Sequence, residues 1–291
     1  MLTHPIKNPT AKRVIISTDA ACEVDDLFAI AQTLLSPTLD VKGIAAAHFL
    51  TPGSMEESRE EILKLLSCMG LSDRIPVLSG SPVPMSREDV PEPSEAARFI
   101  IEEAHRDGPP LYITVQGAAT DVSSAFLMDP TISQGIAGVL WLGGAKYPEG
   151  GSEFNLQNDQ AAGNALMDST LPLWQIPLDA STVIKPSYYE ILLKVKPYGT
   201  LGKYLCDRYE WVLRIAEGAP RETWTLCDMA APGLLLDDHD QVYTVRNAPR
   251  FLPDMRYEET DRVHPIRVYG PLNARFIMED FYCKLQLFSK E

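Results

Sequence analysis

The chain has no long uninterrupted run of apolar residues. No stretch approaches the roughly 18 apolar residues of a transmembrane helix. The N-terminal segment MLTHPIKNPTAKR also lacks the apolar core of a secretory signal. The sequence therefore predicts a soluble, cytoplasmic protein that does not use a membrane as a partner.

Cysteine is scarce, and its spacing fits neither a disulfide framework nor a zinc site. The chain has five cysteines, an odd number, and no CxxC or Cys/His zinc pattern. Reduced thiols are the expected state inside a cell. The five are Cys22, Cys68, Cys206, Cys227 and Cys283.

Basic residues are outnumbered by acidic ones. The chain has 26 Lys and Arg against 40 Asp and Glu, for a formal net charge of -14. Nucleic acids and anionic membranes are bound through basic surfaces, so neither is expected as a partner. A glycine-rich phosphate loop with a well-placed lysine is also missing, which disfavours a Mg²⁺-dependent phosphohydrolase. A divalent cation or a neutral small molecule suits this chain better.

What the sequence does contain is an ordinary globular composition and an alternation of two periodicities. Hydrophobic residues make up 45% of the chain and charged residues 23%. Short β-branched segments alternate with amphipathic ones, which is typical of βαβ units. We therefore predict an α/β fold with an open, mainly parallel central sheet, helices on both faces, and a single domain covering residues 1–291. Strands are expected at 14–16, 41–47, 75–78, 111–115, 139–142, 172–178 and 263–269, helices at 25–35, 55–69, 94–105, 160–167 and 274–287, and a mostly helical segment at 186–236.

Three carboxylates follow the first predicted strand. Asp19 ends a buried β-branched segment, and Asp25 and Asp26 begin the next helix. The carboxyl ends of parallel strands face the crevice where ligands bind, so these side chains should meet there. They would repel one another unless a cation lay between them, and oxygen ligands suit a hard cation such as Ca²⁺. The alternative is that the pair complements the helix dipole and Asp19 is a turn residue.

More polar residues occur near the ends of later strands. Residues 116–121, QGAATD, form a strand-to-helix turn whose small residues let the backbone approach a ligand closely. Glu153 and Asn155 lie in a polar loop that follows the strand end Gly143-Gly144. Asp228 stands between apolar neighbours in a helix-like segment, where a carboxylate needs a partner.

Taken together, these segments resemble the nucleoside hydrolase family, the inosine-uridine preferring N-ribohydrolases. The family's motifs are matched in order over roughly residues 14 to 230. Its opening DxDxxxDD motif is similar to Ser17, Asp19 and Asp25-Asp26, with two additional residues before the pair. Its GPLTN turn is similar to residues 117–121, its GG strand end to 143–144, its EFN motif with a following Asp to 153–155 and Asp159, and its late Asp to Asp228.

The resemblance implies a Rossmann-like nucleoside hydrolase fold and Ca²⁺-dependent hydrolysis of ribonucleosides to ribose and free base, as in purine and pyrimidine salvage. It implies that a metal-bound water is the nucleophile, with Asp19 as its general base. A homodimer or homotetramer is also expected. The implied metal ligands are Asp19, Asp26, the backbone carbonyl of Thr120 and Asp228, and the implied ribose contacts are Asp25, Glu153 and Asn155.

The acid that protonates the leaving base is the open position. The family often has His before the late Asp, whereas this chain has Cys227, as a subgroup of the family does. Cys227 is therefore the candidate acid, although a thiol is a weaker donor than imidazole at neutral pH. His48 follows a strand and is a candidate for the base pocket, with a core position as its alternative.

Three further expectations concern residues around this site. Phe154 and Trp141 are expected to pack in the core rather than contact substrate. The proline-rich loop 86–93 is expected to be mobile, to lie near the mouth of the site and to contact the leaving group. The alternative to an enzyme is a non-catalytic member of the same fold that binds a nucleoside or a ribosyl ligand.

Overall fold

An eight-stranded sheet organises the computed structural model, which describes residues 11–215, 221–237 and 239–290. The strand order is β3-β2-β1-β4-β5-β6-β10-β7. Neighbouring strands are parallel throughout, except that β10 and β7 are antiparallel. The predicted open, mainly parallel sheet is confirmed.

The bounds of the elements are as follows. The strands of the large sheet are β1 Lys12–Thr18, β2 Leu39–Ala46, β3 Val77–Ser79, β4 Leu111–Gln116, β5 Ile136–Leu142, β6 Leu173–Ile176, β7 Tyr243–Asn247 and β10 Pro265–Tyr269; β8 Arg250–Phe251 pairs separately with β9 Tyr257–Glu258. The α-helices are α1 Asp25–Leu34, α2 Ser54–Cys68, α3 Glu95–His105, α4 Thr120–Met128, α5 Phe154–Asn158, α6 Gln160–Asp168, α7 Leu178–Ser181, α8 Tyr188–Lys194, α9 Gly199–Ile215, α10 Ala230–Leu236 and α11 Ala274–Phe288. Two 3₁₀ turns, η1 Pro130–Gln134 and η2 Cys227–Met229, complete the described elements.

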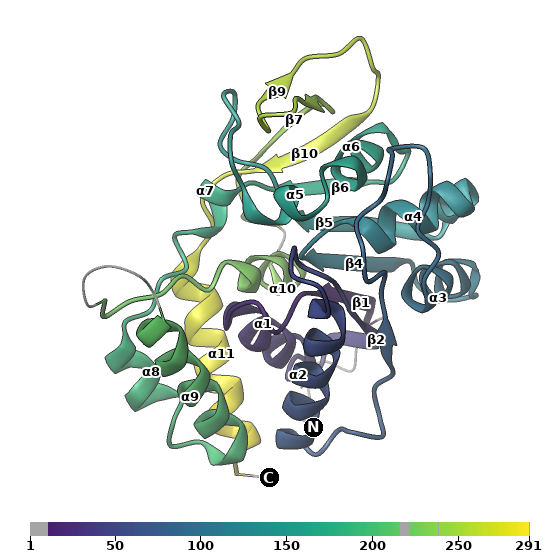
Figure 1. Ribbon diagram of the computed structural model, residues 1–291. Helices are drawn as coiled ribbons and strands as arrows, with labels where there is room; N and C mark the ends of the chain where they lie inside the picture. Colours follow the sequence, from purple (N-terminus) through teal and green to yellow (C-terminus); the bar gives the residue numbers. More distant parts are fainter. Residues whose placement is uncertain (1–10, 216–220, 238, 291) are drawn as a thin grey trace.

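Helices cover both faces of the sheet, as Figure 1 shows. Successive side chains of a strand point to opposite faces, and in β1 both faces are apolar. Val14 and Ile16 pack in a core with residues of α1, α2, α9, α10 and α11, whereas Ile15 packs in a second core with residues of α3, α4 and α6. The sheet is therefore buried between two helical layers, as the alternating sequence pattern predicts.

The predicted elements agree with the structure except in a few places. The strand expected at 172–178 ends at Ile176, so Asp179 lies in α7 rather than at a strand end. The short helix α5 replaces the expected loop at 154–158, and β7, β8 and β9 were not predicted. Residues 216–220 of the segment expected to be helical lie outside the described residues. Across the described ranges, no helix combines the length and hydropathy needed to cross a membrane.

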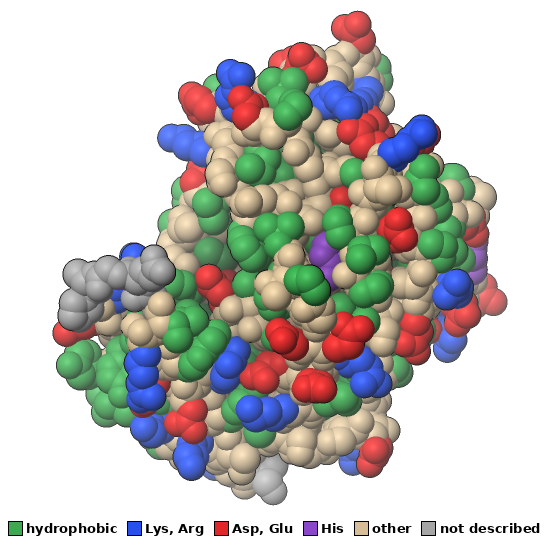
Figure 2. All heavy atoms as spheres, viewed as in Figure 1, with side chains coloured by type: hydrophobic (Ala, Val, Ile, Leu, Met, Phe, Trp, Pro, Cys, Tyr) green, Lys and Arg blue, Asp and Glu red, His purple; other side chains and the backbone are tan. Residues whose placement is uncertain are grey.

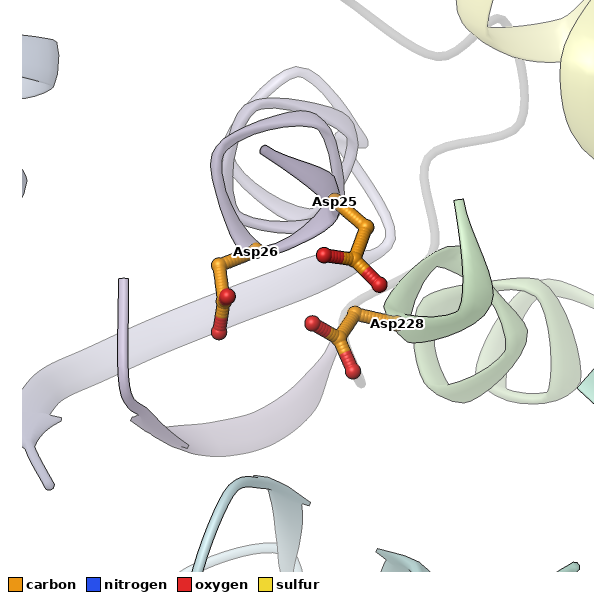
Figure 3. Close-up of side chains that lie close together, drawn as sticks. All are labelled: Asp25, Asp26 and Asp228. Carbon is orange, nitrogen blue, oxygen red and sulfur yellow. The ribbon is translucent and has the colours of Figure 1, made fainter. Parts of the chain in front are cut away.

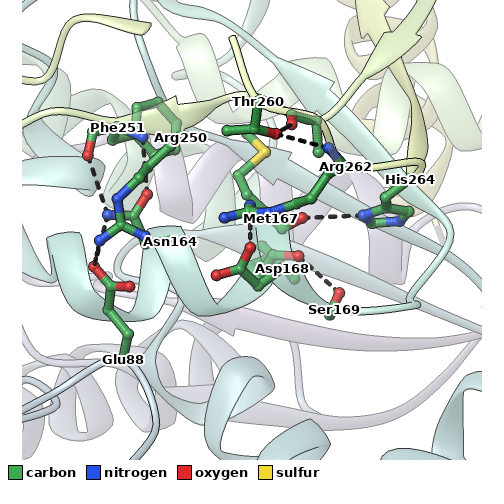
Figure 4. A network of polar contacts seen from close by, with 12 residues as sticks. Glu88, Asn164, Met167, Asp168, Ser169, Arg250, Phe251, Thr260, Arg262 and His264 are labelled. Carbon is green, nitrogen blue, oxygen red and sulfur yellow. Dashed lines mark hydrogen bonds and ion pairs between the residues drawn. The ribbon is translucent and has the colours of Figure 1, made fainter. Parts of the chain in front are cut away.

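A polar network holds the unpredicted 250–262 segment against α6 (Figure 4). The side chain of Asn164 donates to the carbonyl of Phe251 at 3.1 Å and accepts from its N–H at 2.8 Å. Arg250 pairs with Glu88 at 2.6 Å, and Arg262 pairs with Asp168. Glu88 also accepts a hydrogen bond from Asn164, which joins the 86–89 loop to the same network.

The network corrects the expected position of the 86–93 loop. Residues 86–89 line a cavity together with α6 and the 250–253 segment. Residues 86–89 are not among the described residues that line the acidic cavity at the carboxyl ends of the strands.

The surface charge is mixed. On the face in Figure 2, Lys and Arg are interspersed with Asp and Glu and form no basic stripe.

Candidate active site

A cavity of about 240 Å³ opens at the carboxyl ends of β1, β4, β5 and β6. The chain continues from β1 to β2 on one side, while β4 lies on the other side, so this edge contains the point where the strand order reverses. Open α/β sheets bind their ligands at such a point. Six acidic residues line the cavity: Asp19, Glu23, Asp25, Asp26, Glu153 and Asp228.

The opening segment brings its carboxylates together through a tight turn and a helix start. β1 ends at Thr18, and the N–H of Cys22 then donates to the carbonyl of Asp19 at 2.8 Å. α1 begins with Asp25 and Asp26, both buried. The hydroxyl of Thr18 donates to Asp26 and orients that carboxylate toward the cavity.

Asp228 reaches the same place from the distant end of the chain. It lies in η2, just before α10, rather than inside the apolar helix predicted from the sequence. η2 packs against α1. Oxygen atoms of Asp25, Asp26 and Asp228 lie within 4.8 Å of one another, and Figure 3 shows the three side chains pointing toward one another.

Burial and mutual repulsion raise the pKa values of the carboxylates in this cluster. Loss of hydration raises the pKa of Asp25 and Asp228 well above the ordinary value, and the charge of neighbouring carboxylates raises it further. The pKa of Asp26 rises to about 7 by burial, although hydrogen bonds from Thr18 and Asp228 oppose the rise. Carboxylates in this arrangement ionise together only when positive charge lies between them.

Asp19 belongs to the same electrostatic cluster. Burial raises its pKa well above the ordinary value, and the charges of Asp26 and Asp25 add to the effect. Its Oδ2 atom is buried and has no hydrogen-bond partner among the described residues. A Cβ atom at Gly117 would lie 3.1 Å from Cγ of Asp19, so the small residue predicted in this turn lets the backbone approach the carboxylate.

Two predicted site residues, Thr120 and His48, contact each other. Thr120 begins α4, and its hydroxyl donates to Asp159 at 2.7 Å and contacts Nε2 of His48 at 2.9 Å. Neither Thr120 nor His48 is among the described residues that line the cavity. His48 is only 2% exposed, and burial lowers its pKa to about 4, so it is a neutral core histidine. His48 therefore takes the core position that was its alternative, and not a place in the base pocket.

Glu153 and Asn155 line the same cavity from α5 and the residue before it. Glu153 is the N-cap of α5, and its carboxylate accepts from the N–H groups of Asn155, Leu156 and Gly144, each at 2.9 Å. Gly144 has φ +81°, a conformation that favours glycine. The side-chain amide of Asn155 donates to the carbonyl of Leu142 at 3.0 Å. Both side chains are therefore fixed by the ends of β5 and α5.

Comparison with known proteins decides the family. The sequence model described as "Inosine-uridine preferring nucleoside hydrolase" matches residues 14–269, most of the chain. The chain belongs to this family. The matched range contains all the motifs read from the sequence. Of their residues, the cavity is lined by Asp19, Asp25, Asp26, Gly143, Glu153, Phe154, Asn155 and Asp228.

Individual relatives are more distant. The pyrimidine-specific ribonucleoside hydrolase RihA of Citrobacter koseri is 28% identical over 183 residues, which are 54% of this chain and 57% of that protein. The RihA protein of Salmonella arizonae is 29% identical over 54% of this chain and 58% of its own length. The chain thus aligns with little more than half the length of these curated nucleoside hydrolases.

Solved nucleoside hydrolases share the fold over nearly the whole chain. A purine-preferring ribonucleoside hydrolase from Gardnerella vaginalis has a TM-score of 0.82 at 21% identity, with 96% of this chain and 99% of that chain covered. An inosine-uridine preferring nucleoside hydrolase from Bacillus anthracis has a TM-score of 0.69 at 19% identity, with 94% and 99% covered. The Rossmann-like nucleoside hydrolase fold is therefore confirmed.

Cys227 lines the cavity but is a poor acid. Burial raises the pKa of its thiol to about 12, and the charge of Asp25 adds to the rise, while hydrogen bonds from Ser181 and Thr225 oppose it. The thiol keeps its proton at neutral pH and releases it reluctantly. Ser17, which stands where the family has its first Asp, is buried in β1 and is not among the described lining residues.

Several lining residues were not foreseen from the sequence. Phe154 was expected in the core, yet it lines the cavity and is 45% exposed, whereas Trp141 is fully buried as expected. Gln116 ends β4, and Glu23 lies in the opening loop that is two residues longer than the family motif. Trp224 precedes Cys227 by three positions and donates its indole N–H to Glu23 at 2.9 Å. Burial raises the pKa of Glu23, and this N–H opposes the rise.

Asp19→Asn is expected to stabilise the metal-free protein. The raised pKa of Asp19 means that its ionised form is disfavoured in the fold. The ionised Asp19 carboxylate therefore destabilises the fold most at a pH above its pKa in the folded protein. The effect vanishes at a pH below its pKa in the unfolded protein, about 3.9. With chelator at about pH 8, we expect Tm to rise by about 2–4 °C, or roughly 1 kcal/mol for a chain of this size.

Thermal unfolding at about pH 8 and about pH 4 measures this effect. Asp73→Asn is the matched control, because Asp73 is exposed and is not among the described residues that line this cavity. A Tm of Asp19→Asn equal to or below that of the wild type at the higher pH would contradict the account.

Proposed function

We propose that this protein catalyses Ca²⁺-dependent hydrolysis of the N-glycosidic bond of ribonucleosides, giving ribose and the free base. The observation that carries the proposal is the convergence of Asp19, Asp25, Asp26 and Asp228 in a cavity that Glu153 and Asn155 also line. Family membership supports the same activity. The relatives' names differ between purine and pyrimidine substrates, so the proposal covers both classes of base.

The donor set fits Ca²⁺. All the groups are oxygen donors. Oxygen atoms of Asp25, Asp26 and Asp228 lie within 4.8 Å of one another, and Asp19, whose Oδ2 has no partner among the described residues, interacts electrostatically with Asp26 and Asp25. We assign Asp19, Asp26, Asp228 and the backbone carbonyl of Thr120 to the ion. When bound, the ion would supply positive charge that polarises water and orients the sugar hydroxyls.

The protein's own side chains supply the base and the sugar contacts. Asp19, with its free Oδ2, accepts the proton of the attacking water. Asp25 accepts a hydrogen bond from a ribose hydroxyl. A carboxylate has about four lone pairs, and backbone N–H groups use three of those on Glu153, so one is left for a second hydroxyl. The side-chain oxygen of Asn155 is a further acceptor on this wall.

The acidic cavity also suits the transition state. Cleavage of a glycosidic bond passes through an oxocarbenium-like state in which positive charge develops on the sugar. Carboxylates that are already fixed in a buried site stabilise such charge without reorganising. Glu153, fixed at its N-cap position, and Asp25, fixed at the start of α1, are placed for this role in the lining of the cavity.

One observation favours a second candidate function, a non-catalytic nucleoside-binding or ribosyl-binding protein. The raised pKa of Cys227 makes it a weak acid, so a poor leaving base would depart without a proton from this residue.

The hydrolase proposal extends to base salvage in the cytoplasm by a homodimer or homotetramer, as the family resemblance implies.

Ribose release from a panel of purine and pyrimidine ribonucleosides tests the proposal. We expect release with Ca²⁺ and loss of release when the ion is chelated. Asp228→Ala and Asp19→Ala should abolish tight Ca²⁺ binding, measured by calorimetry, while the far-UV circular dichroism spectrum is retained. Full Ca²⁺ occupancy in both variants would contradict the metal assignment. Ca²⁺ binding without release from any nucleoside would favour the non-catalytic binder.

Cys227→His and Cys227→Ala test the candidate acid. Imidazole, with a pKa of about 6.5, donates a proton more readily at neutral pH than this buried thiol. We therefore expect Cys227→His to raise kcat on nucleosides with poor leaving bases by about tenfold or more, and Cys227→Ala to lower it. Steady-state rates at about pH 7 measure both. Wild-type rates in both variants would exclude Cys227 as the acid.

A further inference from the structure

Glu23 and Trp224, two lining residues that the sequence did not predict, are joined by a hydrogen bond in the wall of the cavity. The indole Nε1–H of Trp224 donates to Oε2 of Glu23 at 2.9 Å, although the residues are 201 positions apart in the chain. Glu23 lies in the longer opening loop, and Trp224 lies just before η2. Two departures of this chain from the family motifs, the longer loop and Cys227, therefore lie in the lining of one cavity.

Both residues are held by contacts with α9. The hydroxyl of Tyr209 accepts from the backbone N–H of Trp224 at 2.6 Å and donates to the carbonyl of Pro186 at 2.7 Å. Arg208 donates to the backbone carbonyl of Glu23 at 3.1 Å and also pairs with Glu61. Tyr209 is fully buried, so this part of the wall is fixed before any ligand binds.

The position of the pair places it at the leaving base. In the proposed complex, ribose lies between Asp25 and the wall formed by Glu153 and Asn155. The base then extends toward the remaining wall, which includes Glu23, Trp224 and Cys227. The charge of Glu23 contributes to the raised pKa of Cys227, which places the carboxylate near the candidate acid.

The chemistry of the pair predicts what it recognises. An indole ring offers a flat apolar surface on which a planar base can stack. No described residue donates a hydrogen bond to the second carboxylate oxygen of Glu23, since Trp224 donates to Oε2 alone. In a half-buried site, the free carboxylate oxygen of Glu23 forms a stabilising hydrogen bond when the ligand offers a donor. It stays unpaired when the ligand offers none.

We propose that Glu23 and Trp224 select the leaving base, and that Glu23 accepts a hydrogen bond from a ring N–H or amino group of that base. This assignment rests on the proposed hydrolase function. It makes the protein specific for nucleosides whose base presents a donor on the edge away from the glycosidic bond.

Matched pairs of nucleosides test the assignment. Uridine and 3-methyluridine, or inosine and 1-methylinosine, differ only in a ring N–H that is replaced by N–CH₃. We expect the wild type to prefer the N–H member by about tenfold or more in kcat/KM. In Glu23→Gln, the amide oxygen must face the indole N–H, so the NH₂ group faces the base and the preference should fall to near one.

Two controls separate electrostatic recognition from other effects. Glu88→Gln changes a carboxylate in the other cavity, next to Arg250, and should keep the wild-type preference. Trp224→Phe keeps an aromatic ring but loses the N–H that holds Glu23, so the preference should weaken. Binding of uracil and 3-methyluracil, or of hypoxanthine and 1-methylhypoxanthine, measured by calorimetry, reports the same preference without catalysis.

The outcomes distinguish this assignment from the hydrolase proposal. Hydrolysis of p-nitrophenyl β-ribofuranoside, whose leaving group has no N–H, reports whether the wild type cleaves ribosides at all. If it cleaves this substrate and Glu23→Gln keeps the wild-type preference in both rates and binding, the base-recognition role of Glu23 is overturned. If the wild type with Ca²⁺ cleaves neither this substrate nor any nucleoside, the hydrolase proposal fails and the base-selection role falls with it.

Discussion

Repulsion among four buried carboxylates is the constraint on which the rest of the site depends. Asp19, Asp25, Asp26 and Asp228 are each at most 8% exposed. Burial raises the pKa of each, and the charges of Asp19, Asp25 and Asp26 raise the pKa of other members further. Such a cluster costs folding free energy whenever its members ionise. The two apolar cores around β1 and the packing of η2 on α1 offset this cost and hold the groups in place. The arrangement is therefore suited to a cation and to a sugar that becomes positively charged.

Much of the fold and the acidic half of the site could be predicted from the sequence. Buried parallel strands have continuous β-branched segments, and helices have a different period, so their alternation indicates the sheet directly. Asp19 and Asp228 stood out because a carboxylate beside apolar residues needs a partner. The family motifs then connected them, although 209 positions separate the two in the chain. The small residues of the turn that contains Gly117 were recognised because they let backbone approach a ligand closely, and a Cβ at Gly117 would lie in tight contact with Asp19.

The rest depended on contacts that local patterns do not contain. The strands β7, β8 and β9 were missed because short strands such as the exposed β7 lack a clear apolar period. The antiparallel pairing of β7 with β10 comes from tertiary structure. His48 follows a strand as an active-site residue would, but its ring turns to Thr120 in the core. Phe154 was assigned to the core by composition alone, whereas the N-cap at Glu153 directs it to the cavity. Trp224 carries no sequence signal, because its partner is on the opening loop.

Calorimetric titration of the metal-free protein with Ca²⁺, in buffers of different ionisation enthalpy, tests the central claim most directly. Because the pKa of Asp26 is raised to about 7 and those of its neighbours are raised as well, Ca²⁺ must displace protons at about pH 7. The account predicts binding at one site per chain with net proton release that decreases as the pH is raised. Absence of binding, or binding without proton release at about pH 6 to 7, would contradict it.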